Sequence, residues 1–311
     1  MADRVSRPGW AVAVRALAGI VAVVVVLGIV VVSRAVLLAG HPAYPVLLVV
    51  VALVGLVLVL RSGRRARPGR LRAVGRGAGT LLLLALVAAV VWLRPYPADP
   101  VAVAATEPSG RVAVVHTATT WELRPAGPAA DGDGVGFVFV PGALVDPRAY
   151  LPLLRPLAEQ GVRVVVTAPP LGIALTDPGA VARAVGSAPE IRTWAVGGHS
   201  LGGVAASRAL EVPGVRGLVL WASYPAADVS RAPVTALSVS GSRDALATPD
   251  AVADSWAQLP PGTRFVVVDG GVHAFFGDYG PQTGDGEPGT DRASAQARIV
   301  AETARFVTGL R

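Results

Sequence analysis

Three long apolar runs without charged side chains fill most of the first third of this 311-residue chain. They cover residues 16–32, 36–60 and 77–93, and His41 is the one residue in them whose side chain can be charged near neutral pH. About 20 helical residues cross the hydrocarbon core of a bilayer, where backbone groups must be hydrogen-bonded within the segment itself. We therefore expect residues 1–93 to form a membrane anchor of three transmembrane helices, although the third run is short and opens with glycines.

Arginines flank these runs unevenly and thereby predict an orientation. Arg61–Arg76 contains seven arginines and no acid, and Arg4, Arg7 and Arg15 precede the first run. Because positively charged loops stay in the cytoplasm, both segments are expected there. Three spans then place everything after Leu93 outside the cytoplasm, as a domain of a multi-pass cell-membrane protein. A cleaved signal peptide is less favoured, since the first apolar run exceeds the usual length of about 7–15 residues.

The charge balance changes after the anchor. Residues 1–93 carry eleven arginines and one acid, whereas residues 94–311 carry 17 arginines and 20 acids. A nucleic-acid partner would need a basic surface, so we expect none for the second part. The chain has no cysteine, which excludes disulfides, thiolate ligands and a thiol nucleophile. The acidic loop at 284–287 lacks the spacing of a calcium-binding EF-hand, and we expect neither a metal nor a cofactor.

The remainder of the chain divides into a linker and one domain. Four prolines within residues 94–110 predict a stiff linker. Over residues 111–311, strand-like runs alternate with helix-like runs, which predicts an α/β domain with a doubly wound, mostly parallel sheet. The expected strands are 111–116, 119–123, 135–140, 162–167, 194–196, 215–221, 234–240 and 264–268, and the expected helices are 147–160, 178–185, a segment after Ser200, 249–259 and 292–307.

A serine corner lies between one of these strands and the following helix. Residues 198–203 read Gly-His-Ser-Leu-Gly-Gly, which is a G-x-S-x-G nucleophile elbow. In such an elbow the serine backbone is strained and its hydroxyl is exposed, while the glycines let neighbouring chain approach. The pattern alone is weak because glycine is abundant in this chain. A serine nucleophile also needs a base and a group that orients the base.

His273 and Asp244 are the expected base and orienting acid. His273 follows the last predicted strand in a glycine-rich loop, and Asp244 follows the strand before it. Ser200, Asp244 and His273 therefore occur in the order Ser, acid, His, which differs from the orders of the two common serine protease folds. Asp228 is the main rival acid, and Asp269 is too close to His273 in sequence to orient it easily.

Two backbone N–H groups are expected to bind the oxyanion of a tetrahedral intermediate. One belongs to Leu201, at the start of the helix after the elbow. The other belongs to Ala143, in the Pro-Gly-Ala turn after the strand 135–140. An ordinary strand-ending turn is the alternative interpretation of residues 141–143.

With these motifs the chain resembles the α/β-hydrolase superfamily, and in detail its bacterial dienelactone-hydrolase-like branch. The resemblance spans residues 135–307 and implies a triad of Ser200, Asp244 and His273 with an oxyanion hole at Ala143 and Leu201. Its motifs are Pro-Gly-Ala-Leu-Val-Asp-Pro-Arg-Ala-Tyr at 141–150, Gly-Gly-His-Ser-Leu-Gly-Gly at 197–203, Ala-Ser-Tyr-Pro at 222–225, Gly-Ser-Arg-Asp at 241–244 and His-Ala-Phe-Phe-Gly-Asp-Tyr-Gly-Pro-Gln at 273–282.

The chain also departs from this branch. Ala143 and Leu144 stand where a glycine and a basic residue are common, and Val272 stands where asparagine is common. The dienelactone hydrolases proper use a cysteine nucleophile, so the resemblance does not imply their substrate. The short connection between Ala222 and Val234 leaves no room for the cap domain of many α/β-hydrolases, so an open site is expected.

We therefore expect a membrane-anchored serine hydrolase that cleaves a carboxylic ester, or a thioester or amide, through an acyl-enzyme on Ser200. The expected partners are a small-molecule or lipid-like ester and the lipid bilayer. Two alternatives stay open: a cell-envelope acyltransferase with the same triad, and a binding module without catalysis. The sequence predicts neither the acyl and leaving groups nor the oligomeric state.

Overall fold

The computed structural model describes residues 9–62, 69–108, 110–126 and 134–311. Contacts within the chain separate two compact units. The first contains the N-terminal helices up to Arg94 except for Ala39–His41, and the second contains Ala39–His41 and Pro95–Arg311. Arg4, Arg7 and residues 63–68 of the arginine-rich segment lie outside the described residues.

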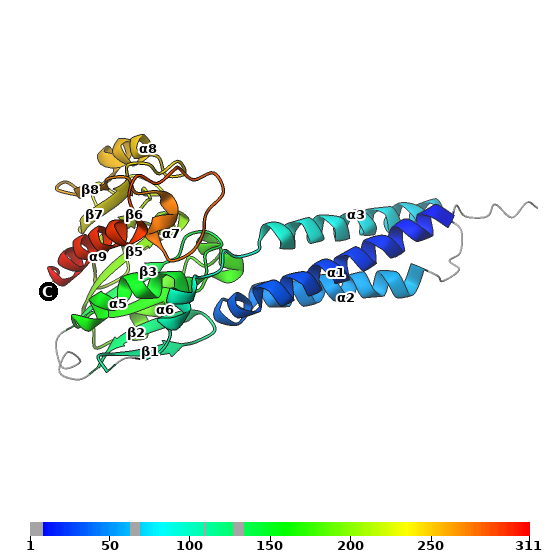
Figure 1. Ribbon diagram of the computed structural model, residues 1–311, viewed down its shortest axis with the longest axis horizontal. Coiled ribbons are helices and arrows are strands. Elements are labelled where there is room, and N and C mark those ends of the chain that lie inside the picture. The colour runs from blue at the N-terminus through cyan, green and yellow to red at the C-terminus, as the bar shows by residue number, and fades with distance from the viewer. Residues whose placement is uncertain (1–8, 63–68, 109, 127–133) are drawn as a thin grey trace, which may run out of the picture. The chain divides into compact units, whose positions relative to one another are not determined.

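Three long helices make up the first unit (Figure 1). They are α1 (Gly9–Ala39), α2 (Ala43–Ser62) and α3 (Arg70–Trp92), and each is long and apolar enough to cross a membrane. The predicted number of apolar helices is thus confirmed, but the predicted bounds are not. Residues 36–39 belong to α1, and α2 begins only after Pro42, because a proline ring cannot continue the helix that precedes it. Good helix formers such as arginine, leucine and alanine extend α3 toward its N-terminus, back to Arg70.

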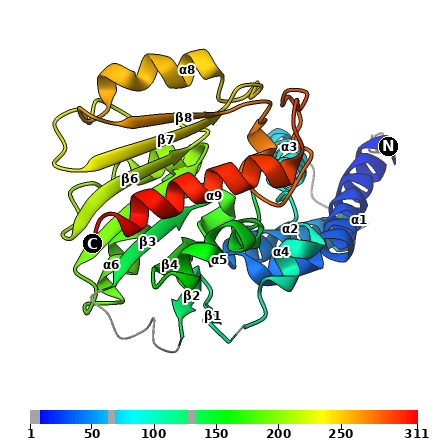
Figure 2. The ribbon, with the colours of Figure 1, turned by 60° about the vertical axis from the view of Figure 1, so that its left-hand side comes forward.

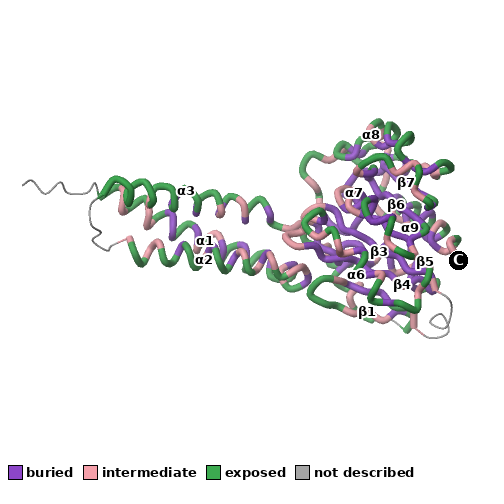
Figure 3. The backbone as a smooth tube through the Cα atoms, turned by 180° about the vertical axis from the view of Figure 1, so that it is seen from behind, coloured by how far each residue is buried: buried purple, intermediate pink, exposed green. Residues whose placement is uncertain are grey.

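A pair of glycines brings α1 and α2 close together. A Cβ atom on Gly19 would lie 2.5 Å from the carbonyl oxygen of Gly55, so only glycine fits there. Small residues at helix contacts are typical of membrane helices, whose backbones pack closely. Elsewhere on the three helices many large apolar residues are exposed, as expected of surfaces that face lipid. Figure 3 shows the exposed stretches along these helices.

The second unit is built on an eight-stranded sheet in the order β1-β2-β4-β3-β5-β6-β7-β8. β1 pairs antiparallel with β2, and β2 with β4, whereas every other pair is parallel. The predicted mostly parallel sheet is therefore confirmed. The strands are β1 (Val112–His116), β2 (Thr120–Pro125), β3 (Val135–Val140), β4 (Arg163–Thr167), β5 (Thr193–His199), β6 (Val215–Trp221), β7 (Thr235–Gly241) and β8 (Arg264–Val268).

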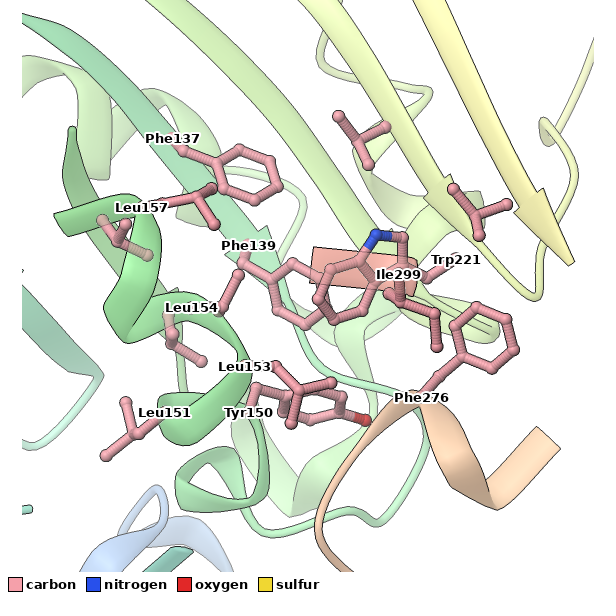
Figure 4. Close-up of a cluster of buried hydrophobic side chains, with 14 of the residues drawn as sticks. Phe137, Phe139, Tyr150, Leu151, Leu153, Leu154, Leu157, Trp221, Phe276 and Ile299 are labelled. Carbon is pink, nitrogen blue, oxygen red and sulfur yellow. The ribbon is translucent and has the colours of Figure 1, made fainter. Parts of the chain in front are cut away.

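Helices cover both faces of this sheet. Phe137 and Phe139 of β3 point to one face, where they pack with residues of α5 (Leu151–Glu159) and α9 (Arg292–Thr308) (Figures 2 and 4). Val138 and Val140 point to the other face, toward α6 (Ala180–Gly186) and α7 (Leu201–Ala206). This alternation, with β3 buried throughout, explains why its sequence is a continuous apolar run.

Shorter elements complete the unit. The predicted helix over 147–160 is a 3₁₀ turn at Pro147–Tyr150 followed by α5. α8 (Pro249–Asp254) likewise ends before its predicted bound and continues as a 3₁₀ turn at Ser255–Gln258. The connection 222–234 between β6 and β7 contains no helix or strand.

The segment expected to be a linker is part of the second unit. Tyr96 forms a parallel bridge with Val145, and Ala98 forms an antiparallel bridge with Tyr279. α4 (Pro100–Ala104) follows, with proline at its first position, where no backbone N–H is needed. The chain is therefore bound to the sheet unit from Tyr96 onward.

Candidate active site

Ser200 occupies the sharp corner that the sequence predicts. β5 ends at His199, α7 begins at Leu201, and Ser200 between them has φ 53° and ψ −125°. A positive φ is uncommon for a non-glycine residue, and such strain is typical of functional sites. Cβ atoms on Gly198 and Gly202 would lie 2.4 Å and 2.0 Å from backbone atoms, so the corner requires glycine at both positions.

Asp244 and His273 meet at the carboxyl edge of the same sheet. Asp244 follows β7, His273 follows β8, and the His273 Nδ1 to Asp244 Oδ2 distance is 2.8 Å. Both side chains are buried. The other carboxylate oxygen of Asp244 accepts the N–H groups of Leu246 and Ala247, at 2.8 Å and 2.7 Å. With Nδ1 directed at Asp244, the Nε2 of His273 is the nitrogen available to act as a base.

Asp285 holds the short helix that carries His273. Its two carboxylate oxygens accept the N–H groups of His273 and Ala274, at 3.0 Å and 2.8 Å, at the start of the 3₁₀ turn His273–Phe276. It thus acts as a helix cap from a distant loop. Sequence analysis missed this residue. The sequence signal for it is the acidic, glycine-rich loop at 284–287, which sequence analysis considers only as a possible calcium loop.

His199 connects the elbow with the histidine. Its ring centroid lies 4.4 Å from that of His273, so Ser200, the next residue, belongs to the same edge of the sheet. The ring is fully buried, and its Nδ1 is 3.0 Å from the Tyr150 hydroxyl. Burial raises the pKa of Tyr150, so its hydroxyl stays protonated in this hydrogen bond. His199 is therefore a packing and hydrogen-bonding residue here.

The charge state of His199 predicts a pH dependence of stability. Burial holds the pKa of His199 well below 6.5, and the neighbouring His273 lowers it further. Below pH 6.5 the unfolded chain binds more protons at this residue than the folded chain, so stability is complete above that pH and falls as the pH is lowered. The slope from one such group reaches about 1.4 kcal/mol per pH unit. We expect the apparent unfolding temperature, followed by tryptophan fluorescence, to depend less on pH below 6.5 in His199→Asn than in the wild type. Equal dependence in both proteins would contradict this role.

The turn after β3 presents one free N–H group. Four of its N–H groups have acceptors: Gly142 bonds the Tyr150 hydroxyl (2.9 Å), Leu144 bonds Gly172 (2.8 Å), Val145 bonds Gly142 (3.2 Å), and Asp146 bonds Tyr96 (3.0 Å). Within the described part of the chain, the N–H group of Ala143 has no acceptor. The same holds for Leu201, in the first turn of α7.

These two free donors come from turns that touch each other. A Cβ on Gly202 would lie 2.0 Å from the carbonyl oxygen of Val140 and 2.4 Å from that of Pro141. The turn after β3 and the start of α7 are therefore in tight contact at these residues. Ala143 is two residues from Pro141 in the sequence, and Leu201 directly precedes Gly202. Two unpaired backbone N–H groups on such adjoining turns suit a developing oxyanion.

The rival acids lie elsewhere. Asp228 is exposed and accepts the N–H of Ser230 at 2.9 Å, and Asp269 is 3.2 Å from the Ser242 hydroxyl. Neither forms a hydrogen bond with His273 among the described residues. No group of three or more His, Asp or Glu side chains in this part of the chain is arranged to hold a metal ion.

Two similar solved structures are a dienelactone hydrolase-like promiscuous phosphotriesterase from metagenomic libraries (16% identity, TM-score 0.48, 61% of this chain and 92% of that chain covered) and Est1E from Butyrivibrio proteoclasticus (11% identity, TM-score 0.47, 65% and 99% covered). No curated protein matches the sequence. A family model, described as the alpha/beta hydrolase family, matches residues 136–297, just over half of the chain and all of the segment from Ser200 to His273. The chain therefore belongs to the α/β-hydrolase family.

Proposed function

We propose that this protein is a serine hydrolase that cleaves a carboxylic ester through an acyl-enzyme on Ser200. The observation that carries the proposal is the buried Asp244–His273 hydrogen bond of 2.8 Å at the sheet edge that also holds the strained Ser200. A serine hydroxyl is a weak nucleophile at neutral pH, and an imidazole oriented by a carboxylate is the usual means of activating it.

In the proposed reaction, Nε2 of His273 accepts the proton of the Ser200 hydroxyl as Oγ bonds to the ester carbonyl carbon. The N–H groups of Ala143 and Leu201 stabilise the negative oxygen of the tetrahedral intermediate. His273 then returns the proton to the departing alcohol, which leaves an acyl group on Ser200. Water attacks this acyl-enzyme by the same steps, releases the carboxylic acid and regenerates the serine. Thioesters and amides are substrates of the same chemistry.

The experiment that tests this proposal follows the full chain, purified in detergent, with a series of p-nitrophenyl esters. We expect release of p-nitrophenol, and, after rapid acid quenching, a mass increase equal to the acyl group on the peptide that contains Ser200. If neither turnover nor an acyl adduct appears with any ester, thioester or amide of the series, the catalytic proposal fails and a binding role gains support.

Acyl transfer is the second candidate function. Three apolar helices in the same chain favour it, because they would hold the site near a bilayer that contains acceptor alcohols and amines. Adding an alcohol or amine to the ester assay separates the two functions. An acyltransferase would convert most of the acyl group into a new ester or amide, whereas a hydrolase would release mainly the free acid.

We also propose that the three helices cross the cell membrane with the hydrolase unit outside the cytoplasm. The support is the segment 61–76, which runs from the end of the second helix into the start of the third. It holds seven arginines and no acid, and this favours the cytoplasmic side. Alkaline phosphatase fused after Arg70 should be inactive, and the same enzyme fused after Val101 should be active. A green fluorescent protein fusion should give the opposite pattern, and matching signals at the two positions would overturn the topology.

A further inference from the structure

Residues 95–99 begin the continuous part of the sheet unit, Pro95–Arg311, and lie against both halves of the candidate site. In the sequence they come directly after Arg94, two residues beyond the end of α3 at Trp92. The N–H of Tyr96 donates to the carbonyl of Leu144 at 2.7 Å, and the N–H of Asp146 donates to the carbonyl of Tyr96 at 3.0 Å. Tyr96 is therefore bonded on both sides to the turn that presents the free N–H of Ala143.

This turn needs external support because it contains a strained residue. Leu144 has φ 61°, a conformation that costs a branched side chain free energy and persists only where the surroundings fix it. Its N–H is held by Gly172 and its carbonyl by Tyr96. The bond from Tyr96 holds the peptide group that follows Leu144. Ala143 directly precedes Leu144, so we expect the loss of this bond to loosen the orientation of the Ala143 N–H as well.

The same segment reaches the chain that follows His273. The N–H of Asp99 donates to the carbonyl of Asp278 at 2.8 Å, and Ala98 pairs with Tyr279. The Asp99 carboxylate also forms an ion pair with Arg292 at 2.6 Å, and Arg292 donates to the carbonyl of Tyr279 at 2.9 Å. Residues 95–99 thus join the oxyanion turn to the segment downstream of the histidine.

We propose that residues 95–99 are a positioning segment of the active site, which holds the oxyanion turn and the histidine segment in register. The inference rests on the proposed hydrolase function and adds that the residues directly after the anchor are needed for turnover. Their role is structural support at the transition state: they touch no reacting atom, and they fix the donor that does. A displacement of about 1 Å at such a donor costs about 100-fold in rate.

Two matched insertions in the full chain test this role. Gly-Gly inserted between Arg94 and Pro95 lengthens the connection but leaves every bond of Tyr96 and Asp99 possible. The same Gly-Gly inserted between Pro97 and Ala98 shifts Asp99 by two residues relative to Tyr96. The two residues then cannot form their hydrogen bonds at the same time. We expect the first insertion to keep kcat within twofold of the wild type. The second should lower kcat by at least about tenfold with KM within threefold, since the lost interaction acts in the transition state.

A second pair covers the case in which the inner insertion prevents folding. Tyr96→Pro removes the N–H that holds Leu144, whereas Tyr96→Ala removes the ring and keeps that N–H. We expect kcat to fall further in Tyr96→Pro than in Tyr96→Ala, with both variants folded by tryptophan fluorescence. Equal kcat in wild type, both insertions and both substitutions would refute the positioning role and leave the hydrolase proposal standing. A wild type without any turnover would refute the hydrolase proposal itself, and the inference with it.

Discussion

Ser200→Ala should lower the kcat for ester hydrolysis by at least about 10⁴-fold, because no acyl-enzyme can form without the hydroxyl. The fold should be unaffected, because the Ser200 hydroxyl has no hydrogen-bond partner among the residues that the structure describes. The bonds of Ser200 involve its backbone: its N–H donates to the carbonyl of Trp221, and its carbonyl accepts from the Ser223 hydroxyl. Steady-state rates with a p-nitrophenyl ester and the apparent unfolding temperature measure both effects.

Ser187→Ala is the matched control for this substitution. Ser187 lies at the end of α6. Among the described residues its hydroxyl bonds only the carbonyl of Ala184 in the same helix, at 2.7 Å. We expect its kcat to stay within twofold of the wild type. If Ser200→Ala retains the same activity as Ser187→Ala, another residue is the nucleophile.

Asp244→Asn should lower kcat by about 10⁴-fold with little change in KM. The carboxylate is hydrogen-bonded to Nδ1 of His273. In the proposed mechanism this bond leaves Nε2 free to take the proton of Ser200. An asparagine amide that donates to Nδ1 would favour the other tautomer, with the proton on Nε2, and this imidazole cannot act as a base toward Ser200. Rates for folded Asp244→Asn, checked by its unfolding temperature, test this orientation.

The control for Asp244→Asn is Asp269→Asn. Asp269 also follows a strand at the carboxyl edge, but its carboxylate is 3.2 Å from the Ser242 hydroxyl rather than beside the histidine. We expect at most a twofold effect on kcat. Comparable losses in the two variants would mean that general electrostatics, and not the orientation of one imidazole, sets the rate.

The sheet and its edge could be predicted from the sequence because their signals are local. Continuous apolar runs such as Val135–Val140 predict strands buried on both faces, and the structure has β3 with these bounds. Parallel strands also end at one edge, so Asp244 and His273 could be expected to approach each other from their positions after two strands. The hydrogen bond between their side chains agrees with that expectation.

The supports of the site could not be predicted because they come from distant segments. Asp285 caps the turn of His273 from twelve residues away. The Tyr150 hydroxyl accepts the N–H of Gly142 from eight residues away and contacts the ring of His199 from 49 residues away. No periodicity or spacing marks such contacts. The prolines on either side of Tyr96 are typical of a linker. Proline is also compatible with the extended backbone of a β-bridge when the neighbouring residues form the backbone hydrogen bonds, because its missing N–H is then not needed.

Labelling of the full chain with a fluorophosphonate probe, followed by peptide mapping, bears most directly on the nucleophile. Such probes bond to an activated serine and not to ordinary hydroxyls, so labelling reports the activation itself and needs no knowledge of the ester. We expect one adduct, on Ser200, in the wild type and in Ser187→Ala, and none in Ser200→Ala. Equal labelling of the wild type and Ser200→Ala, or no labelling of either, would contradict the assignment of Ser200 as an activated nucleophile.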